Sequence, residues 1–113
     1  MSAYDYYLSQ GYTPTWKVAS FNGVGTITVW TPRTSTRIVL TQLNVATNLA
    51  TSVAFYYGNL AGDKIIQFNV AASAFVVSDI LADSGTYDRT LVANVVASGT
   101  DGVKVTAVGF EIP

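Results

Sequence analysis

Three aspartates lie close together in the second half of the chain, at Asp79, Asp83 and Asp88. Carboxylate oxygens at this density are the kind of ligand that Ca²⁺ prefers. Their spacing differs from the alternating Asp-x-Asp-x-Asp-Gly of a calcium loop, and residues 83–85 (Asp-Ser-Gly) are an ordinary turn sequence. Asp88 also has Arg89 beside it as an ion-pair partner. The segment therefore favours a turn, and we assign no metal site.

The sequence lacks the residues of the commoner catalytic sites. It contains no histidine and no cysteine, which excludes a Ser-His-Asp triad, a thiolate metal site and a disulfide framework. Glu111 is the single glutamate, and nothing in the sequence pairs it with residues 79–88 as a glycosidase would require. No glycine-rich phosphate-binding motif occurs. We expect no enzymatic activity, no catalytic residues and no cofactor, and a hydrolase built on residues 79–88 stays a minor hypothesis.

Aromatic residues suited to protein contacts are concentrated near the N-terminus. Four of the seven tyrosines lie in the first twelve residues. Tyrosine combines an apolar ring with a hydroxyl group and suits a partly hydrated interface, in which arginine is also enriched. The candidate interface residues are Tyr4, Tyr6, Tyr7, Tyr12, Trp16, Trp30, Arg33 and Arg37.

A sugar-binding platform is a second interpretation of the aromatic residues. Trp16, Trp30, Tyr56 and Tyr57 fall on predicted strands and would offer flat apolar faces to sugar rings. Packing in a core or an interface is the more frequent fate of aromatics on strands. The alternative function is therefore a carbohydrate-binding or receptor-binding module.

The elements that must position these residues are strands. Valine and threonine are abundant, both favour the pleated strand, and turn signals such as Asn22-Gly23 recur at short spacing. The pattern predicts an all-β fold of about eight antiparallel strands, a jelly-roll-like β-sandwich over residues 16–113, with an immunoglobulin-type sandwich as the alternative. We predict strands at residues 16–21, 26–31, 36–46, 51–57, 64–70, 74–81, 90–97 and 103–112.

Residues 1–15 form a separate tyrosine-rich segment. We expect an extended N-terminal arm that lies along a neighbouring subunit, or else the first strand of the chain's own sandwich. Two changes of phase in the alternating pattern predict bulges, one between Leu40 and Leu43 and one near Gly109.

The charge content sets the class of function. Charged residues make up 12% of the chain and hydrophobic residues 50%, whereas an ordinary soluble domain is roughly 25% charged. The net charge is −1 and the sequence has no run of basic residues, so no nucleic-acid contact is expected. No apolar stretch approaches the roughly 20 residues of a membrane helix, so no membrane contact is expected. With no Sec-type signal at the N-terminus, we expect synthesis in the cytoplasm. Much of the surface is expected to be covered by other protein.

A set of strand and turn motifs carries a resemblance to a known family. Residues 34–40 read Thr-x-x-Arg-Ile-x-Leu, residues 53–58 read Val-x-Phe-x-x-Gly, and residues 62–68, 91–97 and 102–111 continue the order. This order resembles small β-sandwich virion proteins of tailed bacteriophages, among them capsid decoration (cement) proteins and related head or tail accessory proteins. The resemblance implies a homo-oligomer, often a trimer, seated on the major capsid protein or another virion protein. It implies no active site, so no site residue carries over.

Overall fold

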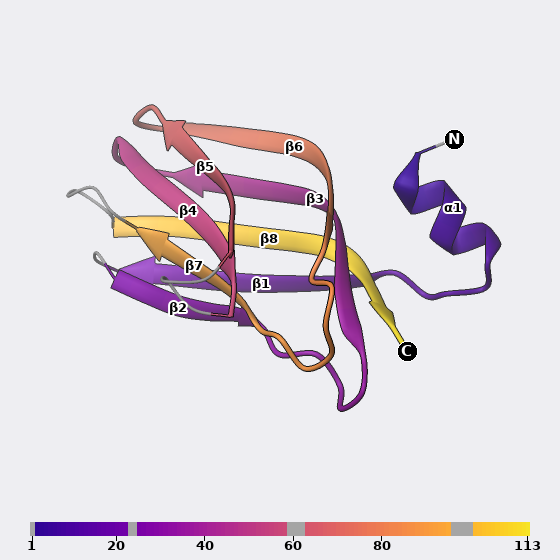
Figure 1. The fold of residues 1–113 in the computed structure, drawn as a ribbon. Coiled ribbons are helices and arrows are strands. Elements are labelled where there is room, and N and C mark those ends of the chain that lie inside the picture. The colour runs from indigo at the N-terminus through magenta and orange to yellow at the C-terminus, as the bar shows by residue number, and fades with distance from the viewer. Residues whose placement is uncertain (1, 23–24, 59–62, 96–100) are drawn as a thin grey trace.

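The computed structural model describes residues 2–22, 25–58, 63–95 and 101–113, which form two stacked sheets and a short helix (Figure 1). No helix in these residues is long and apolar enough to cross a membrane. The eight predicted strands are confirmed; positions 96 and 97 of the predicted 90–97 strand lie outside the described residues. The elements are α1 (Ala3–Ser9), β1 (Thr15–Asn22), β2 (Gly25–Trp30), β3 (Arg37–Thr47), β4 (Thr51–Tyr57), β5 (Asp63–Val70), β6 (Ala74–Asp83), β7 (Leu91–Val95) and β8 (Asp101–Ile112).

The strand order is that of a jelly roll. Sheet A has the order β1-β8-β3-β6 and sheet B the order β2-β7-β4-β5, and every pair of neighbours is antiparallel. Only β4 and β5 are consecutive strands paired in one sheet, so each of the other connections passes from one sheet to the other. The jelly-roll-like sandwich is therefore confirmed over the immunoglobulin type.

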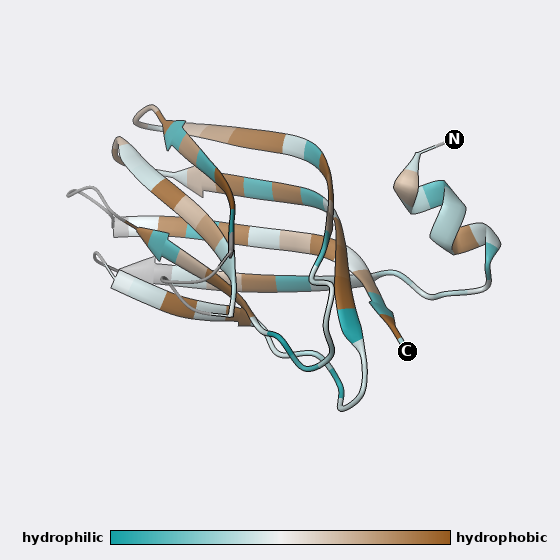
Figure 2. Cartoon of the chain, viewed as in Figure 1, coloured by the Kyte–Doolittle hydropathy of each residue, from teal (hydrophilic) through white to brown (hydrophobic). Residues whose placement is uncertain are grey.

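The core lies between the two sheets. Hydrophobic and more polar residues alternate along several strands, as expected where one face of a strand is buried (Figure 2). As predicted, Val53, Phe55 and Tyr57 share the inward face of β4 and are at most 3% exposed. Ile66 and Phe68 of β5 pack against the same core.

A bulge in β3 changes the phase of its alternation. The register of β3 shifts between Leu40 and Gln42 against both of its neighbours. Against β8, Thr41 is the extra residue, whereas against β6 Thr41 faces two residues, Ile80 and Leu81. Inward positions pass from Ile38 and Leu40 to Leu43, as the sequence predicts.

The predicted bulge near Gly109 is corrected. β8 pairs with β1 without a break from Gly109 to Val103, and the shift next to Gly109 belongs to β3. The change of phase in β8 has another cause. Phe110 and Ile112 lie on the outer side of sheet A, where they form a second buried cluster with the N-terminal tyrosines.

The predicted extended arm is wrong for residues 3–9, which form α1. The Ser2 side chain accepts a hydrogen bond from the Asp5 backbone N–H, and Asp5 places a negative charge in the first turn, where the helix dipole favours it. Tyr4 and Tyr7 then pack on Phe110 of the same chain, with ring centroids 5.6 and 5.5 Å away. Burial of this tyrosine face holds a helix of only seven residues in place.

Replacing Tyr7 tests this docking of α1. Tyr7 contacts Phe110 and Tyr12, whereas Tyr6 is 50% exposed on the same helix. We expect Tyr7→Ala to lower the free energy of unfolding by about 1–2 kcal/mol and Tyr6→Ala by less than about 0.5 kcal/mol. Urea unfolding measures both, and because the two variants change helix propensity equally, equal losses would contradict the packing of Tyr7.

Candidate functional site

The outer side of sheet A is covered by α1 only in part and carries exposed apolar side chains on its two edge strands. Five large apolar side chains there are more than half exposed: Trp16 (59%), Val18 (60%), Phe75 (74%), Val77 (54%) and Leu81 (67%). They lie on β1 and β6, the two edge strands of sheet A. We call this surface the outer face of sheet A. An exposed apolar surface of this kind is typical of a face that other protein covers.

The outer side of sheet B is different. Polar side chains pair across its strands, with Thr26 of β2 donating a hydrogen bond to Asn94 of β7 at 3.0 Å. Ser52 of β4 likewise donates to Asn69 of β5. These polar side chains form hydrogen bonds with each other across the strands. Sheet B therefore shows no comparable need for a protein partner.

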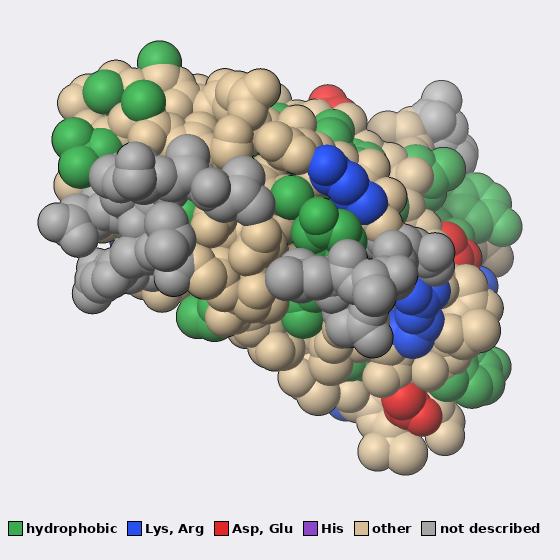
Figure 3. Space-filling model, turned by 60° about the vertical axis from the view of Figure 1, so that its left-hand side comes forward, with side chains coloured by type: hydrophobic (Ala, Val, Ile, Leu, Met, Phe, Trp, Pro, Cys, Tyr) green, Lys and Arg blue, Asp and Glu red, His purple; other side chains and the backbone are tan. Residues whose placement is uncertain are grey.

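On the face seen in Figure 3, the end of the sandwich at which β5 turns into β6 shows no charged side chain. In Figure 3 hydrophobic side chains gather there, at the upper left, without a charged side chain among them. The few charged side chains are thus unevenly distributed, and some surfaces carry none that is visible.

A groove separates α1 from the outer face of sheet A. Its volume is about 290 Å³, and its lining combines the rings of Tyr4 and Trp16 with the polar side chains of Gln42 and Asp79. The Gln42 amide donates a hydrogen bond to Asp79 Oδ1 at 3.2 Å. A second hollow of about 410 Å³ continues along α1 and is lined by Ala3, Tyr4 and Leu81 among others. Aromatic faces beside an amide and a carboxylate can hold either a sugar ring or an apolar side chain of another protein.

The two tryptophans have opposite environments. Trp16 is exposed beside this groove, which agrees with a contact role. Trp30 is 1% exposed in the core, which corrects the prediction that it lines an interface or a sugar platform. Tyr57 is also in the core, at 3% exposure, so the predicted four-residue platform does not form.

Trp30 and Arg33 share Glu111 as an acceptor. Trp30 Nε1 donates to Glu111 Oε2 at 2.9 Å, and Arg33 Nε donates to Oε1 at 2.7 Å. Burial of the carboxyl raises its pKa, but the hydrogen bonds from Trp30 and Arg33 outweigh this effect and the pKa of Glu111 is lowered. Arg33 thus has a structural partner, although its side chain is 73% exposed.

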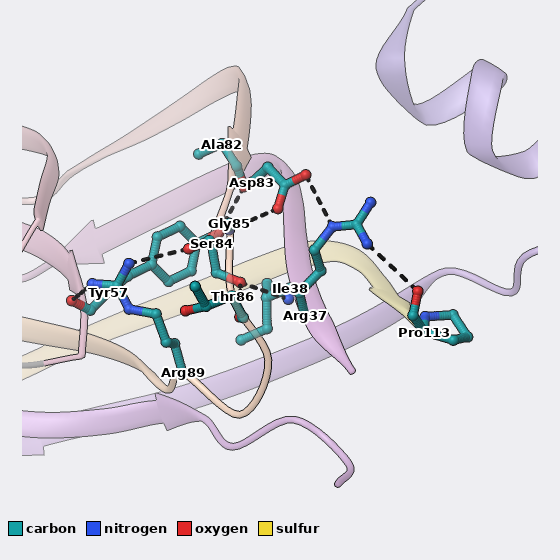
Figure 4. Close-up of polar contacts among 10 residues, drawn as sticks. All are labelled: Arg37, Ile38, Tyr57, Ala82, Asp83, Ser84, Gly85, Thr86, Arg89 and Pro113. Carbon is teal, nitrogen blue, oxygen red and sulfur yellow. Dashed lines mark hydrogen bonds and ion pairs between the residues drawn. The ribbon is translucent and has the colours of Figure 1, made fainter. Parts of the chain in front are cut away.

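The acidic segment is held by separate partners (Figure 4). Asp83 accepts hydrogen bonds from Arg37 Nε at 3.1 Å and from the Gly85 backbone N–H at 2.8 Å. Asp88 accepts from the Ser35 backbone N–H at 2.8 Å, while Asp79 lies on the outer face of sheet A beside Gln42. No group of three potential metal ligands gathers within the described part of the chain.

Arg89, which the sequence offered only as an ion-pair partner for Asp88, has a structural role. Its guanidinium donates to the backbone carbonyls of Ser84 and Tyr57 at 3.1 and 2.8 Å and lies over the Tyr57 ring, 5.9 Å from its centroid (Figure 4). The Tyr57 hydroxyl donates to the Ala82 carbonyl at 2.7 Å, and burial raises the pKa of Tyr57. These contacts tie the β6–β7 connection to β4.

No protein-family model and no curated protein matches the sequence. Solved structures share the fold. A protein of the disulfide-linked pili of Bacillus endospore appendages is 8% identical, with a TM-score of 0.54 over 90% of this chain and 91% of that chain. A cyanophage Pam1 capsid chain is 15% identical, with a TM-score of 0.49 over 89% and 84%. A family 6 carbohydrate-binding module is 15% identical, with a TM-score of 0.45 over 92% and 90%. Identities this low show a common jelly-roll-like fold and no particular family.

Proposed function

We propose that this chain is a non-enzymatic structural subunit of a virus particle, most simply an oligomeric capsid decoration (cement) protein that stabilises the head lattice. The observation that carries the proposal is the outer face of sheet A, where Trp16 and Val18 on one edge strand and Phe75, Val77 and Leu81 on the other are exposed. Because only 12% of its residues are charged, the chain has few charged side chains that could keep this surface hydrated without a partner.

The stabilising mechanism is repeated burial of apolar surface. Each Å² removed from water contributes about 25 cal/mol, before the loss of freedom on association is subtracted. Copies arranged on a symmetric lattice make the same contact many times, so a modest contact resists dissociation of the whole shell. The chain contains no cysteine, so non-covalent burial has to provide this cohesion.

The virion assignment is supported by the sequence resemblance to phage β-sandwich proteins over residues 34–112. The jelly-roll-like fold is compatible with it. The major capsid protein or another virion protein is then the second partner, and the resemblance implies a homo-oligomer.

The proposal is tested by the mass and the binding of the chain. We expect light scattering to give a multiple of 12.0 kDa, and we expect the chain to cosediment with heads of the virus that encodes it. A monodisperse monomer that does not bind heads would contradict the proposal.

The groove beside α1 favours a second candidate, a carbohydrate-binding or receptor-binding module of a phage tail or fibre. Tyr4 and Trp16 would stack on a sugar ring, while Gln42 and Asp79 would bind its hydroxyl groups. Binding on a glycan array that is lost in Trp16→Ala and kept in Val18→Ala would favour this candidate. An array without signal would count against it.

A further inference from the structure

We propose that β6 is a self-association edge, at which two copies of this chain pair antiparallel about a twofold axis through Ser78. The inference rests on the proposed function, because a structural subunit binds further copies of itself. It names the strand, the register and the side chains of one such contact.

β6 is the least protected of the four sheet edges. It has ten residues, pairs with β3 on one side in the described structure, and contains neither lysine nor proline. Among the other edges, β1 carries Lys17, β5 carries Lys64, and β2 has only six residues. Lysine, proline and short length are among the means of preventing an edge from pairing, and β6 lacks all three. Its one register shift lies near its end, where Ile80 and Leu81 face Thr41 of β3, and the alternation of exposed and half-buried side chains continues through it.

The side chains of β6 are nearly symmetric about Ser78. Residues 75–81 read Phe-Val-Val-Ser-Asp-Ile-Leu. A twofold axis at Ser78 places Phe75 of each copy across from Leu81 of the other on the outer face, and Val76 across from Ile80 on the inner face. A second copy therefore supplies the apolar complement to both faces of the strand.

The charges of β6 select this register. With the axis at Ser78, Asp79 lies across from Val77 of the second copy and keeps its hydrogen bond from Gln42. With the axis one residue later, the two Asp79 carboxylates would face each other, and like charges directly opposite are destabilising. Pairings offset by one residue are excluded because they would set inward side chains against outward ones.

The hollow beside α1 provides a surface for the partner's ring. It lies on the same face of sheet A as Phe75 and is lined by Ala3, Tyr4 and Leu81. Phe75 of the second copy, across from Leu81, comes beside this hollow, and an aromatic ring buries roughly 150–250 Å². With two such rings and the paired strands, the contact buries on the order of 1,000 Å², which reaches the lower limit for a specific interface.

A charge substitution on β6 tests the contact. We expect Leu81→Lys to raise the dimer dissociation constant at least about tenfold, because the lysine lies across from Phe75 in both halves of the contact. Thr28→Lys, at an exposed position on the edge strand β2 of sheet B, is the control and should leave the mass unchanged. Val77→Lys tests the register, since its lysine meets Asp79 of the second copy and the dimer should persist.

A single cysteine gives a direct readout, because the chain contains no other cysteine. Symmetric antiparallel partners have Cα atoms about 4.5–5.5 Å apart, within the range that a disulfide spans. Under mild oxidation Ser78→Cys should give a covalent dimer, whereas Ser20→Cys, exposed on β1, should not.

The outcomes separate this inference from the proposed function. An oligomer that persists in Leu81→Lys with unchanged melting, or equal cross-linking of the two cysteine variants, would overturn the β6 contact and leave the virion proposal standing. A wild-type trimer, or a wild-type monomer that still binds virus heads, would also overturn the β6 contact and leave the virion proposal standing. The reason is that the contact requires an even number of copies. A monomer that binds no heads would overturn both.

Discussion

Trp30→Ala is expected to lower the free energy of unfolding by about 3–5 kcal/mol, the range for removing a large aromatic side chain from a core. Trp30 is 1% exposed within the core between the two sheets. Its Nε1 donates to Glu111, so the substitution also removes a hydrogen bond between β2 and β8. Urea unfolding followed by far-UV circular dichroism measures the loss without relying on tryptophan fluorescence.

Trp16→Ala is the matched control for this prediction. Trp16 is 59% exposed, so its removal should change the unfolding free energy by less than about 0.5 kcal/mol. It should instead weaken binding of whatever covers the outer face of sheet A. Similar stability losses in the two variants would show that the assignment of Trp30 to the core and Trp16 to the surface is wrong.

The strands were predictable because burial on one face leaves a period of two in the sequence. Val53, Phe55 and Tyr57 alternate as a half-buried strand must, and the structure places all three inward. The same alternation holds in an immunoglobulin-type and a jelly-roll sandwich. The order β1-β8-β3-β6 depends on pairings between residues far apart in the chain, which no local pattern records.

The short helix was missed because its stability comes from packing. Residues 3–9 lack an apolar period long enough to indicate a helix, and Tyr4 and Tyr7 become partly buried only through Phe110, more than a hundred positions away. A local signal was present. Ser2 followed three residues later by Asp5 is a helix N-terminus pattern, and it marks the residue at which α1 begins.

The candidate surface was predictable in part. Trp16 and the tyrosine-rich segment do border the groove on the outer face of sheet A. The apolar row on β6 was missed because residues 75–81 are apolar on both faces, as in a strand that is buried on both sides. Whether such a strand lies inside a sheet or at its edge is decided by the topology.

Gly109→Ala is expected to lower the free energy of unfolding by about 3 kcal/mol, at the upper end of the range for an overpacked core. A Cβ at position 109 would lie 2.2 Å from the Val39 carbonyl oxygen and 3.1 Å from the Leu40 Cα. Both are backbone atoms next to the Thr41 bulge, so relief of the clash requires β3 and β8 to separate where their register shifts.

Gly85→Ala is the comparison that isolates this close approach. Gly85 has a φ of 81°, and a Cβ there would meet nothing within 4 Å, so its substitution carries backbone strain alone, about 1 kcal/mol. Chemical unfolding of both variants should therefore show the larger loss at position 109, although its backbone is the less unusual of the two. A smaller loss at position 109 would mean that β8 does not approach β3 this closely. The bulge at Thr41 would then lack the glycine that accommodates it, and the change of phase between Leu40 and Leu43 would need another explanation.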